Sequence, residues 1–404
     1  MLLKTKSRAV GKSRNWDTEP RGWRPDADSL SLFDSQLSTS SRELEGRASP
    51  GWLREVLILS GRFCNRILFA LLLVSFSGGL LLLGQEEQNT IVTPHGDVLA
   101  PSKDGGLKVV RAKESFSTLT LEGSDLRPEP PLSGGHVSNA DFARELVRLQ
   151  WRPGDPIDTY VIRPAKVKKP PVVLYLYGYP TELDRFRNKD YANRVVSSGA
   201  AAVGFLSART GYRAEHHPMR EWFVPVLPES LTTTVHDVQL ILNYLATRDD
   251  LDTSRVGIYG QGSGGAIAVL AAATDPRIKA IDLVNPWGDW PDWLAKAYNL
   301  SPSERERCLK PEFLKSVESL DPVAYLPKLV SLPMRMQFVD VDMARVKVAM
   351  AKLEKAAPAS AKVLHYPDGV SMYRETSDGR LFEWIAAALK SPTETKQAAT
   401  TTTH

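Results

Sequence analysis

The stretch RVGIYGQGSGGAIAVLAA, residues 255–272, decides the fold of this 404-residue chain. An apolar run ends in a turn that holds four glycines, and an alanine-rich segment follows the turn. Small residues in such a turn allow a buried strand and the next helix to approach each other closely. We therefore expect a strand over residues 255–260 that leads into a helix over residues 264–274.

Segments with the composition of strands and of helices alternate from residue 136 to residue 390. The strand segments are 145–151, 158–164, 172–178, 200–206, 255–260, 278–285, 334–340 and 361–366. The helical patterns are 190–198, 232–247, 264–274, 344–356 and 380–389. Such alternation is typical of α/β proteins, in which helices connect parallel strands. The sequence predicts an α/β domain with a mostly parallel eight-stranded sheet and helices on both faces.

Outside residues 136–390 the sequence lacks sustained periodicity and is rich in turn-forming residues. Residues 1–60 are expected to form a disordered cytoplasmic arm, and residues 391–404, which contain a threonine run, a disordered tail. Residues 86–135 contain the breakers PSKDGG and LRPEPPLSGG, which indicate a linker. A single transmembrane helix, residues 61–85, is predicted to precede this linker.

The membrane prediction depends on ILFALLLVSFSGGLLLLG, residues 67–84, which hold no charge. This length is close to the lower limit for a helix that spans a bilayer. Arginines precede the run and glutamates follow it, which predicts a cytoplasmic N-terminus and an extracytoplasmic C-terminal domain. We expect an uncleaved signal-anchor because no A-x-A-like cleavage site follows. The alternatives are a buried core helix and a cleaved signal starting near Gly61, which would make the domain secreted.

Charge distribution and cysteine count exclude several classes of function. Lysine and arginine number 51, aspartate and glutamate 47, and the surplus of four lies within residues 1–66. The neutral remainder lacks a basic face, so no nucleic-acid partner is expected. Cys64 and Cys308 are too few for a disulfide framework. We expect no metal and no cofactor, because no His/Cys/Asp spacing resembles a ligand set and GQGSGG lacks the Lys-Ser/Thr ending of a P-loop.

Three parts of the sequence carry a family resemblance: VVLYLYGYP (172–180), HDVQLILNYLATRDDLDTSRVGIYGQGSGGAIAVLAA (236–272), and the pair LPMRMQFVDVD (332–342) and AKVLHYPDGVSMY (361–373). Together they resemble the α/β-hydrolase superfamily, in particular its prolyl-oligopeptidase and dienelactone-hydrolase-like branches. The resemblance covers nearly all of residues 136–390 and implies an α/β-hydrolase fold. It also implies a triad with a nucleophile at a G-x-Ser-x-G elbow, an acid after a later strand and a histidine after the last strand.

The elbow of this chain has no serine at the position that the resemblance assigns to the nucleophile. Counted from the strand, that position is Gly262. A register shifted by one residue would make Ser263 the nucleophile, but it would put Gln261 where the elbow needs a small residue. By the same correspondence, the backbone N–H groups of Tyr179 and Ser263 would form the oxyanion-type donor pair.

The acid position keeps its residue type and the histidine position does not. Asp342 follows the strand 334–340 at the acid position, with Asp340 as the second choice, although a solvated loop carboxylate is the simpler interpretation. Ser371 stands at the histidine position, and a serine cannot accept a proton near neutral pH as imidazole does.

Three other histidines are the possible replacements for the missing base. His365 lies inside the strand 361–366, where we expect a packed or edge histidine. His216 and His217 lie in GYRAEHHPMREW, a loop that either reaches the mouth of the site or is solvated.

The combined loss of nucleophile and histidine predicts a pseudoenzyme of the serine hydrolase family. Removal of the nucleophile lowers the rate of such enzymes by about 10⁶. We expect a retained pocket for a small molecule, a peptide or a partner. The aromatic candidates for ligand contact are Tyr177, Trp222, Trp287 and Trp290. The simpler interpretation of the tryptophans is a structural lid.

Two other functions remain open at this point. One is an active serine hydrolase, an esterase or a prolyl-oligopeptidase-type peptidase, that combines Ser263 and Asp342 with a histidine from an unexpected loop. The other is a purely structural extracytoplasmic domain, which predicts a filled pocket under residues 287–293.

Overall fold

The structure is a computed structural model, and its described residues belong to the predicted α/β domain and to the segment before it. They are 91–92, 98–99, 114–124, 126, 131–152, 155–176, 178, 184–208, 213, 224, 226–298, 300–376 and 382–390. All lie within the unit Gly84–His404. The predicted arm 1–60, membrane helix 61–85 and tail 391–404 lie outside them. Across the described residues, no helix combines the length and the apolar character needed to cross a membrane.

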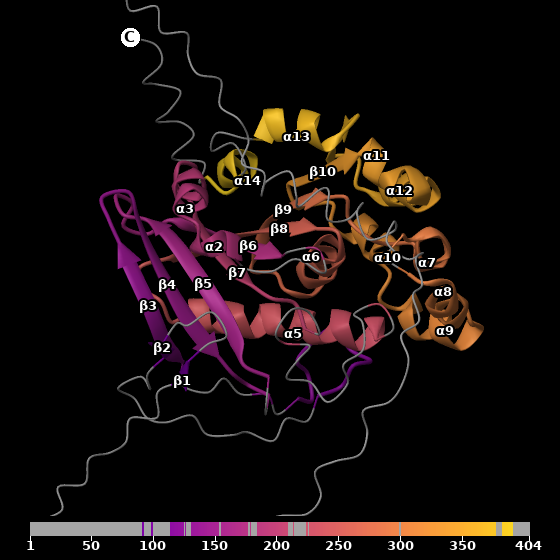
Figure 1. Ribbon diagram of the computed structural model, residues 1–404, viewed down its shortest axis with the longest axis horizontal. Coiled ribbons are helices and arrows are strands. Elements are labelled where there is room, and N and C mark those ends of the chain that lie inside the picture. Colours follow the sequence, from indigo (N-terminus) through magenta and orange to yellow (C-terminus); the bar gives the residue numbers. More distant parts are fainter. Residues whose placement is uncertain are drawn as a thin grey trace, which may run out of the picture. The chain divides into compact units, whose positions relative to one another are not determined.

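One sheet of nine strands organises the domain (Figure 1), in the order β11-β10-β9-β8-β6-β7-β5-β4-β3. The strands are β3 Leu132–Ser138, β4 Phe142–Leu149, β5 Ile157–Pro164, β6 Pro171–Leu176, β7 Ala201–Phe205, β8 Asp252–Gln261, β9 Ile278–Val284, β10 Met334–Val339 and β11 Lys362–Tyr366. From β7 to β11 all neighbours pair in parallel, whereas β3, β4, β5 and β7 pair antiparallel. A separate hairpin joins β1 (Ile91–Val92) and β2 (Val98–Leu99).

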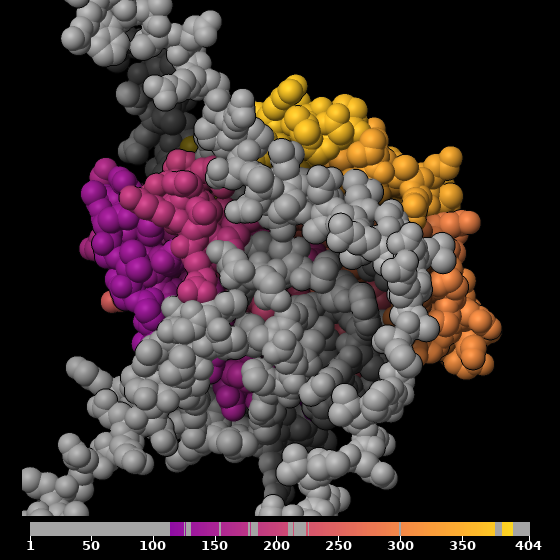
Figure 2. Space-filling model, viewed as in Figure 1, coloured from indigo at the N-terminus to yellow at the C-terminus, as the bar shows by residue number. Residues whose placement is uncertain are grey.

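The prediction of eight strands is wrong by one strand, β3. Its sequence is LSGGHVS, and residues 132–135 fall in the predicted linker because two adjacent glycines indicate a turn. In the sheet these glycines lie at a register irregularity between Ser133 and His136. An edge strand tolerates such a bulge. Figure 2 shows the purple atoms of this N-terminal part of the sheet at one side of the face and the orange to yellow atoms of the C-terminal helices at the other.

Helices cover both faces of the sheet. They are α2 Asp184–Arg187, α3 Lys189–Val196, α5 Leu227–Leu245, α6 Ser263–Thr274, α7 Trp290–Lys296, α8 Pro302–Cys308, α9 Pro311–Glu318, α10 Pro322–Tyr325, α11 Asp340–Met343, α12 Lys347–Ala356, α13 Gly369–Thr376 and α14 Glu383–Ala388. Gly257 and Gly260 of β8 are an odd number of residues apart and face opposite sides. A Cβ on Gly257 would meet Ile385 of α14, and one on Gly260 would meet the backbone of Gly264 in α6. The helices α14 and α6 therefore cover opposite faces.

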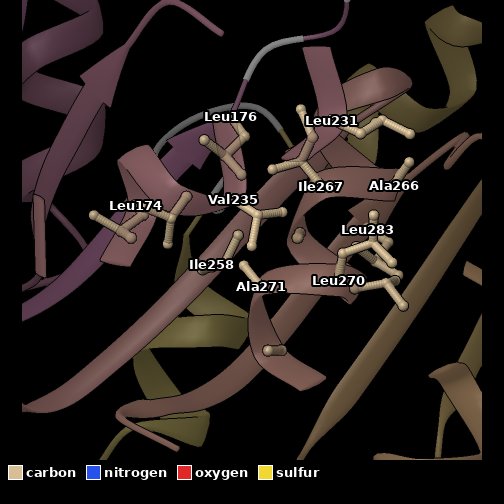
Figure 3. Packing of buried hydrophobic residues seen from close by; sticks show 14 of the residues in the cluster. Leu174, Leu176, Leu231, Val235, Ile258, Ala266, Ile267, Leu270, Ala271 and Leu283 are labelled. Atoms are coloured by element: carbon tan, nitrogen blue, oxygen red, sulfur yellow. The ribbon is translucent and has the colours of Figure 1, made fainter. Parts of the chain in front are cut away.

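The main core lies between the sheet and the helices α5 and α6 (Figure 3). Leu231 and Val235 of α5 and Ile267 of α6 pack in one cluster with Leu174 of β6 and Ile258 of β8, all fully buried. Helix α6 consists mainly of small and apolar residues and has no polar face. Such a composition is required of a helix that is enclosed between α5 and the sheet. Burial of one such large side chain contributes about 1.5–3 kcal/mol. This layer holds the strand-turn-helix unit in place.

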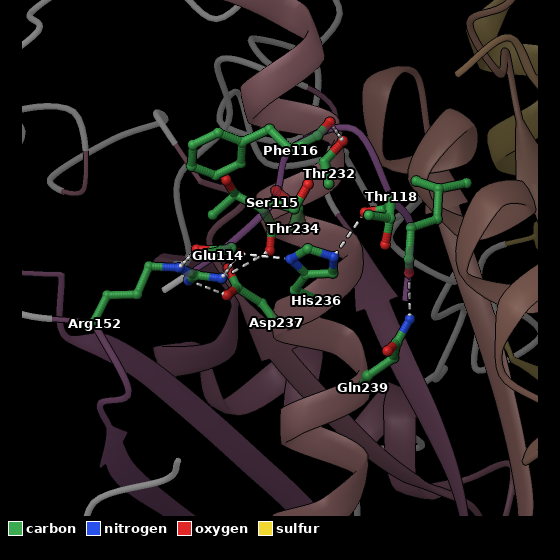
Figure 4. A network of polar contacts seen from close by, with 12 residues as sticks. Glu114, Ser115, Phe116, Thr118, Arg152, Thr232, Thr234, His236, Asp237 and Gln239 are labelled. Atoms are coloured by element: carbon green, nitrogen blue, oxygen red, sulfur yellow. Dashed lines mark hydrogen bonds and ion pairs between the residues drawn. The ribbon is translucent and has the colours of Figure 1, made fainter. Parts of the chain in front are cut away.

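A segment of the predicted linker packs on helix α5. We call residues 114–124 the strap. Leu119 of the strap is buried, and its carbonyl accepts a hydrogen bond from Nε2 of Gln239 at 2.7 Å. Nε2 of His236 donates to the Thr118 carbonyl at 2.9 Å (Figure 4). The folded domain thus includes residues upstream of position 136.

A buried network of charges fixes the first residue of the strap (Figure 4). Arg152 donates to both carboxylate oxygens of Glu114, at 2.5 and 2.7 Å, and to Oδ1 of Asp237 in α5. Arg213 donates to Asp155 and, at 2.8 Å, to the second oxygen of Asp237. Because each buried charge has an opposite partner, the network connects the strap, the connection between β4 and β5, and α5 without an uncompensated ion.

Candidate functional site

The turn between β8 and α6 has the geometry of a nucleophile elbow, and Gly262 is at its apex. Gly262 adopts φ +55° and ψ −118°, a conformation that L side chains rarely adopt. Its N–H donates to the Val284 carbonyl at 2.9 Å. A Cβ on Gly260 would lie 2.5 Å from the Gly264 carbonyl oxygen, so strand and helix touch two residues to either side of the apex. This contact explains the glycine-dense sequence.

Ser263, the alternative nucleophile, is the first residue of α6 and is fully buried. The residue two places before it is Gln261, whereas the tight strand–helix contact is at Gly260. The backbone thus bends at Gly262 and not at the serine.

The space in front of the apex is occupied by Trp287. Its indole Nε1 lies 3.3 Å from the place that a Cβ on Gly262 would take, and its backbone N–H donates to the Gly262 carbonyl at 3.0 Å. The Trp287 ring packs on Trp293 with 4.2 Å between centroids. Trp290 is 1% exposed, and its indole N–H donates to the Leu320 carbonyl at 3.0 Å. Trp287 and Trp290, two of the residues predicted to contact a ligand, therefore pack as part of the core in this structure.

Asp342, at the predicted acid position, has an amide and a phenol as neighbours. It is half-buried in α11, and its Oδ2 accepts from Nδ2 of Asn285 at 3.2 Å. Burial raises the pKa of Asp342, and the Asn285 bond opposes that shift. Oδ1 of Asn285 accepts from the Val339 N–H at 2.8 Å, so this side chain joins the ends of β9 and β10. Burial and the charge of Asp342 raise the pKa of Tyr298, which is 41% exposed, to about 12.

Asp340, the second choice for the acid, binds His365 at the edge of the sheet. Nδ1 of His365 lies 2.8 Å from Asp340 Oδ1, and its Nε2 lies 2.5 Å from Oε1 of Glu354 in α12. The ring stacks on Phe338. The Asp340 bond raises the pKa of His365, burial opposes this, and Glu354 raises it further. Both ring nitrogens are occupied by carboxylates, so His365 pairs with surface groups.

Ser371, at the predicted histidine position, lies in α13. Its backbone N–H donates to Oδ1 of Asp368 at 2.7 Å. Both ring nitrogens of His236 are bound by the strap. The predicted residues Tyr177, Tyr179, His216, His217 and Trp222 lie outside the described residues. Within the described ranges, no group of three or more His, Cys, Asp or Glu side chains is placed to hold a metal ion.

Sequence reasoning missed Asn285 and the position of Trp287 at the apex. Asn285 has φ 44°, and a short polar residue followed by proline directly after a buried strand was the available signal. The sequence contains no signal for the contact of Trp287 with Gly262, because they are distant in the chain and meet only when β8 and β9 pair.

The nine-stranded sheet, the elbow and the enclosed helix α6 define an α/β-hydrolase fold. Residues 157–287 match the dienelactone hydrolase family. A comparison with curated proteins gave no match. This match agrees with the resemblance of the chain to the α/β-hydrolase superfamily and its dienelactone-hydrolase-like branch. The family match includes the elbow but ends before Asp342 and Ser371.

Solved structures of esterases are similar to this chain. An acetyl xylan esterase from Paenibacillus sp. R4 has a TM-score of 0.50 and 17% identity, over 67% of this chain and 90% of that one. Acetyl xylan esterase 1 from a Thermoanaerobacterium species has a TM-score of 0.47 and 14% identity, over 66% and 89%. An S-formylglutathione hydrolase from Agrobacterium tumefaciens has a TM-score of 0.48 and 15% identity, over 63% and 99%. At 17% identity, the acetyl xylan esterase from Paenibacillus sp. R4 supports the fold of this chain and nothing beyond the fold.

Proposed function

We propose that this protein is a non-hydrolytic α/β-hydrolase-fold protein that binds a small molecule, a peptide or a partner at the C-terminal edge of its sheet. The observation that carries the proposal is Gly262, a residue without a nucleophilic atom, at φ +55° on the elbow apex. Loss of the nucleophile lowers the rate of a serine hydrolase by about 10⁶. Glycine also removes the backbone strain of about 1–3 kcal/mol that a serine bears there.

The surroundings of Asp342 support a binding role. The carboxylate is half-buried, and among the described residues its hydrogen-bond partner is the Asn285 amide. The exposed ring of Tyr298 lies within the electrostatic reach of Asp342. An acid and an aromatic ring at the C-terminal edge of a parallel sheet are typical of a ligand site in α/β proteins.

A purely structural domain is the second candidate function. It is favoured by the Trp287 indole in front of Gly262, because a filled elbow leaves a ligand no access to that point.

Labelling with a fluorophosphonate probe tests the absence of hydrolysis. The full-length chain, the Ser263→Ala variant and the Gly262→Ser variant are incubated with the probe in detergent, beside an active serine esterase. We expect no labelling of the first two proteins. Labelling of the wild type that disappears in Ser263→Ala would establish an active serine hydrolase with a displaced nucleophile and overturn the proposal. Labelling of Gly262→Ser alone would mean that a working base exists outside the described residues.

We also propose that residues 67–84 anchor the protein in a membrane, with the N-terminus cytoplasmic and the domain extracytoplasmic. The uncharged apolar run and the flanking charges support this orientation. Carbonate extraction of membranes, followed by protease treatment of intact cells or spheroplasts, tests it. Recovery of the full-length chain in the carbonate-soluble fraction would contradict the anchor, and a shortened soluble chain would indicate a cleaved signal.

A further inference from the structure

We infer that residues 285–293, here called the plug, are a built-in occupant of the elbow, in which the Trp287 indole seals the place of the nucleophile side chain. The inference goes beyond the proposed function, whose binding role is supported by Asp342 and Tyr298, and rests on it in one respect, namely that Gly262 is the native apex. It adds that the elbow is closed from within, and that a planar aromatic molecule of indole size is the ligand it would accept if Trp287 were removed.

The fit of Trp287 against the apex is the first argument. Its Nε1 and Cε2 lie 3.3 and 3.7 Å from the place that a Cβ on Gly262 would take. The Trp287 N–H also donates to the Gly262 carbonyl at 3.0 Å, so backbone and ring are both held at the turn. Trp293 packs against the same ring with 4.2 Å between centroids, and Trp287 is 7% exposed. A side chain at position 262 would therefore be in tight contact with this indole from its Cβ onward.

The attachment of the plug beyond Trp287 is the second argument. The backbone N–H groups of Asp289 and Trp290 donate to the two carboxylate oxygens of Asp321, at 2.9 and 3.0 Å. The Trp290 indole N–H donates to the Leu320 carbonyl. Lys352 of α12 donates to Asp289 at 3.0 Å and also pairs with Asp292. These bonds come from the two residues that precede α10 and from α12, and they hold the segment as a fixed part of the domain.

The backbone of the plug is shaped for this position. Asn285 and Asp289 are the two non-glycine residues with positive φ among the described residues, and they flank Trp287. Between them, a Cβ on Gly288 would lie 2.7 Å from a methyl carbon of Leu353. Positive φ at a non-glycine residue persists only when the surrounding contacts determine it. The strained ends and the bonds to Asp321 together direct the indole at the apex.

The test replaces the indole by a void and then refills it. Trp287→Ala in the full-length protein creates an apolar cavity at the elbow, and such cavities bind small aromatic molecules. We expect isothermal titration calorimetry to give saturable binding of one indole per chain. Indole at 100 times its Kd should raise the ratio of folded to unfolded protein about 100-fold. The wild type should not bind indole.

Trp290→Ala is the matched control because the same side chain is removed from the same cluster away from Gly262. Equal indole binding by Trp290→Ala would overturn the inference, and so would a folded Trp287→Ala that binds none. If Trp287→Ala does not fold, Trp287→Val serves in its place, because the smaller void that it leaves has room for benzene and not for indole. Absence of benzene binding by that variant would also overturn the inference.

The two proposals fail in different experiments. Fluorophosphonate labelling of wild-type Ser263 would overturn the proposed function and leave indole binding by Trp287→Ala unaffected. Absence of binding in the cavity variants would overturn the plug and leave the labelling result unchanged.

Discussion

Replacement of Glu114 by alanine tests whether the strap is part of the folded domain. The Glu114 carboxylate is 5% exposed and accepts from Nε and an NH2 group of Arg152, at 2.5 and 2.7 Å. It also lies 2.6 Å from Nδ1 of His236, which is 1% exposed. Alanine removes the acceptor of all three contacts. Arg152 then keeps its contacts with Asp237 and Asp155, and among the described residues His236 keeps the Thr118 carbonyl.

The size of the effect follows from the burial of the groups left behind. Removal of one partner from a buried ion pair costs about 3–5 kcal/mol, because the remaining charge cannot be solvated. A buried donor without an acceptor costs about 1–3 kcal/mol. Arg152 retains part of its compensation, so the costs are not additive. We expect Glu114→Ala to lower the free energy of unfolding by about 3–4 kcal/mol.

Urea unfolding followed by circular dichroism measures this change as a shift of the midpoint. Glu122→Ala is the matched control, because Glu122 is an exposed glutamate of the same strap. Its effect should stay within about 0.5 kcal/mol. If Glu114→Ala unfolds at the same urea concentration as Glu122→Ala, then the strap is not held by this network and the reasoning is refuted.

The same carboxylate gives the strap a dependence on pH. Burial raises the pKa of Glu114, but the bonds from Arg152 and His236 lower it by more, so that it lies below the ordinary value of 4.5. A lowered folded pKa means that the stabilisation is present above about pH 4.5 and is lost as the pH falls through the folded pKa. Between pH 5 and pH 3, roughly, Glu114→Gln should lose less stability than the wild type. A parallel loss in both proteins would contradict this assignment.

Three further predictions concern the elbow and the sheet. Gly262→Ala should lower the free energy of unfolding by about 1–3 kcal/mol, because φ +55° costs an L residue about 1–2 kcal/mol and the new Cβ meets an indole nitrogen at 3.3 Å. An unchanged urea midpoint would be inconsistent with the strained apex. Because the pKa of His365 is raised, its stabilisation is present below about pH 6.5 and is lost as the pH rises through the folded pKa. His365→Gln should therefore reduce the dependence of the urea midpoint on pH above about pH 6.5, and an unchanged pH profile would refute the assignment. Asp282→Asn should cost about 3–5 kcal/mol, because it leaves the buried Arg335 guanidinium without its carboxylate at 2.5 and 2.9 Å, and a midpoint shift below about 1 kcal/mol would contradict this.

Much of the elbow could be predicted from local sequence because its geometry is imposed by neighbouring residues. The glycines at 260, 262, 264 and 265 allow the close approach of β8 and α6, and the backbone conformation of Gly262 follows from that approach. The alternation of segments likewise predicted the α/β fold, since periodicity records which face of an element is buried. The strand β3 was missed because its two glycines have the composition of a turn, and only pairing with β4 makes them a strand.

Residue identity in local patterns was enough to predict the fold class and the glycine at the elbow apex. The tertiary structure alone decided which residues surround that apex. Trp287 meets Gly262 only after β8 and β9 pair, and Asp342 meets Asn285 across 57 residues of sequence. Glu114 meets His236 across 122 residues. Contacts at such separations depend on how whole elements pack, and this information is distributed over the entire chain.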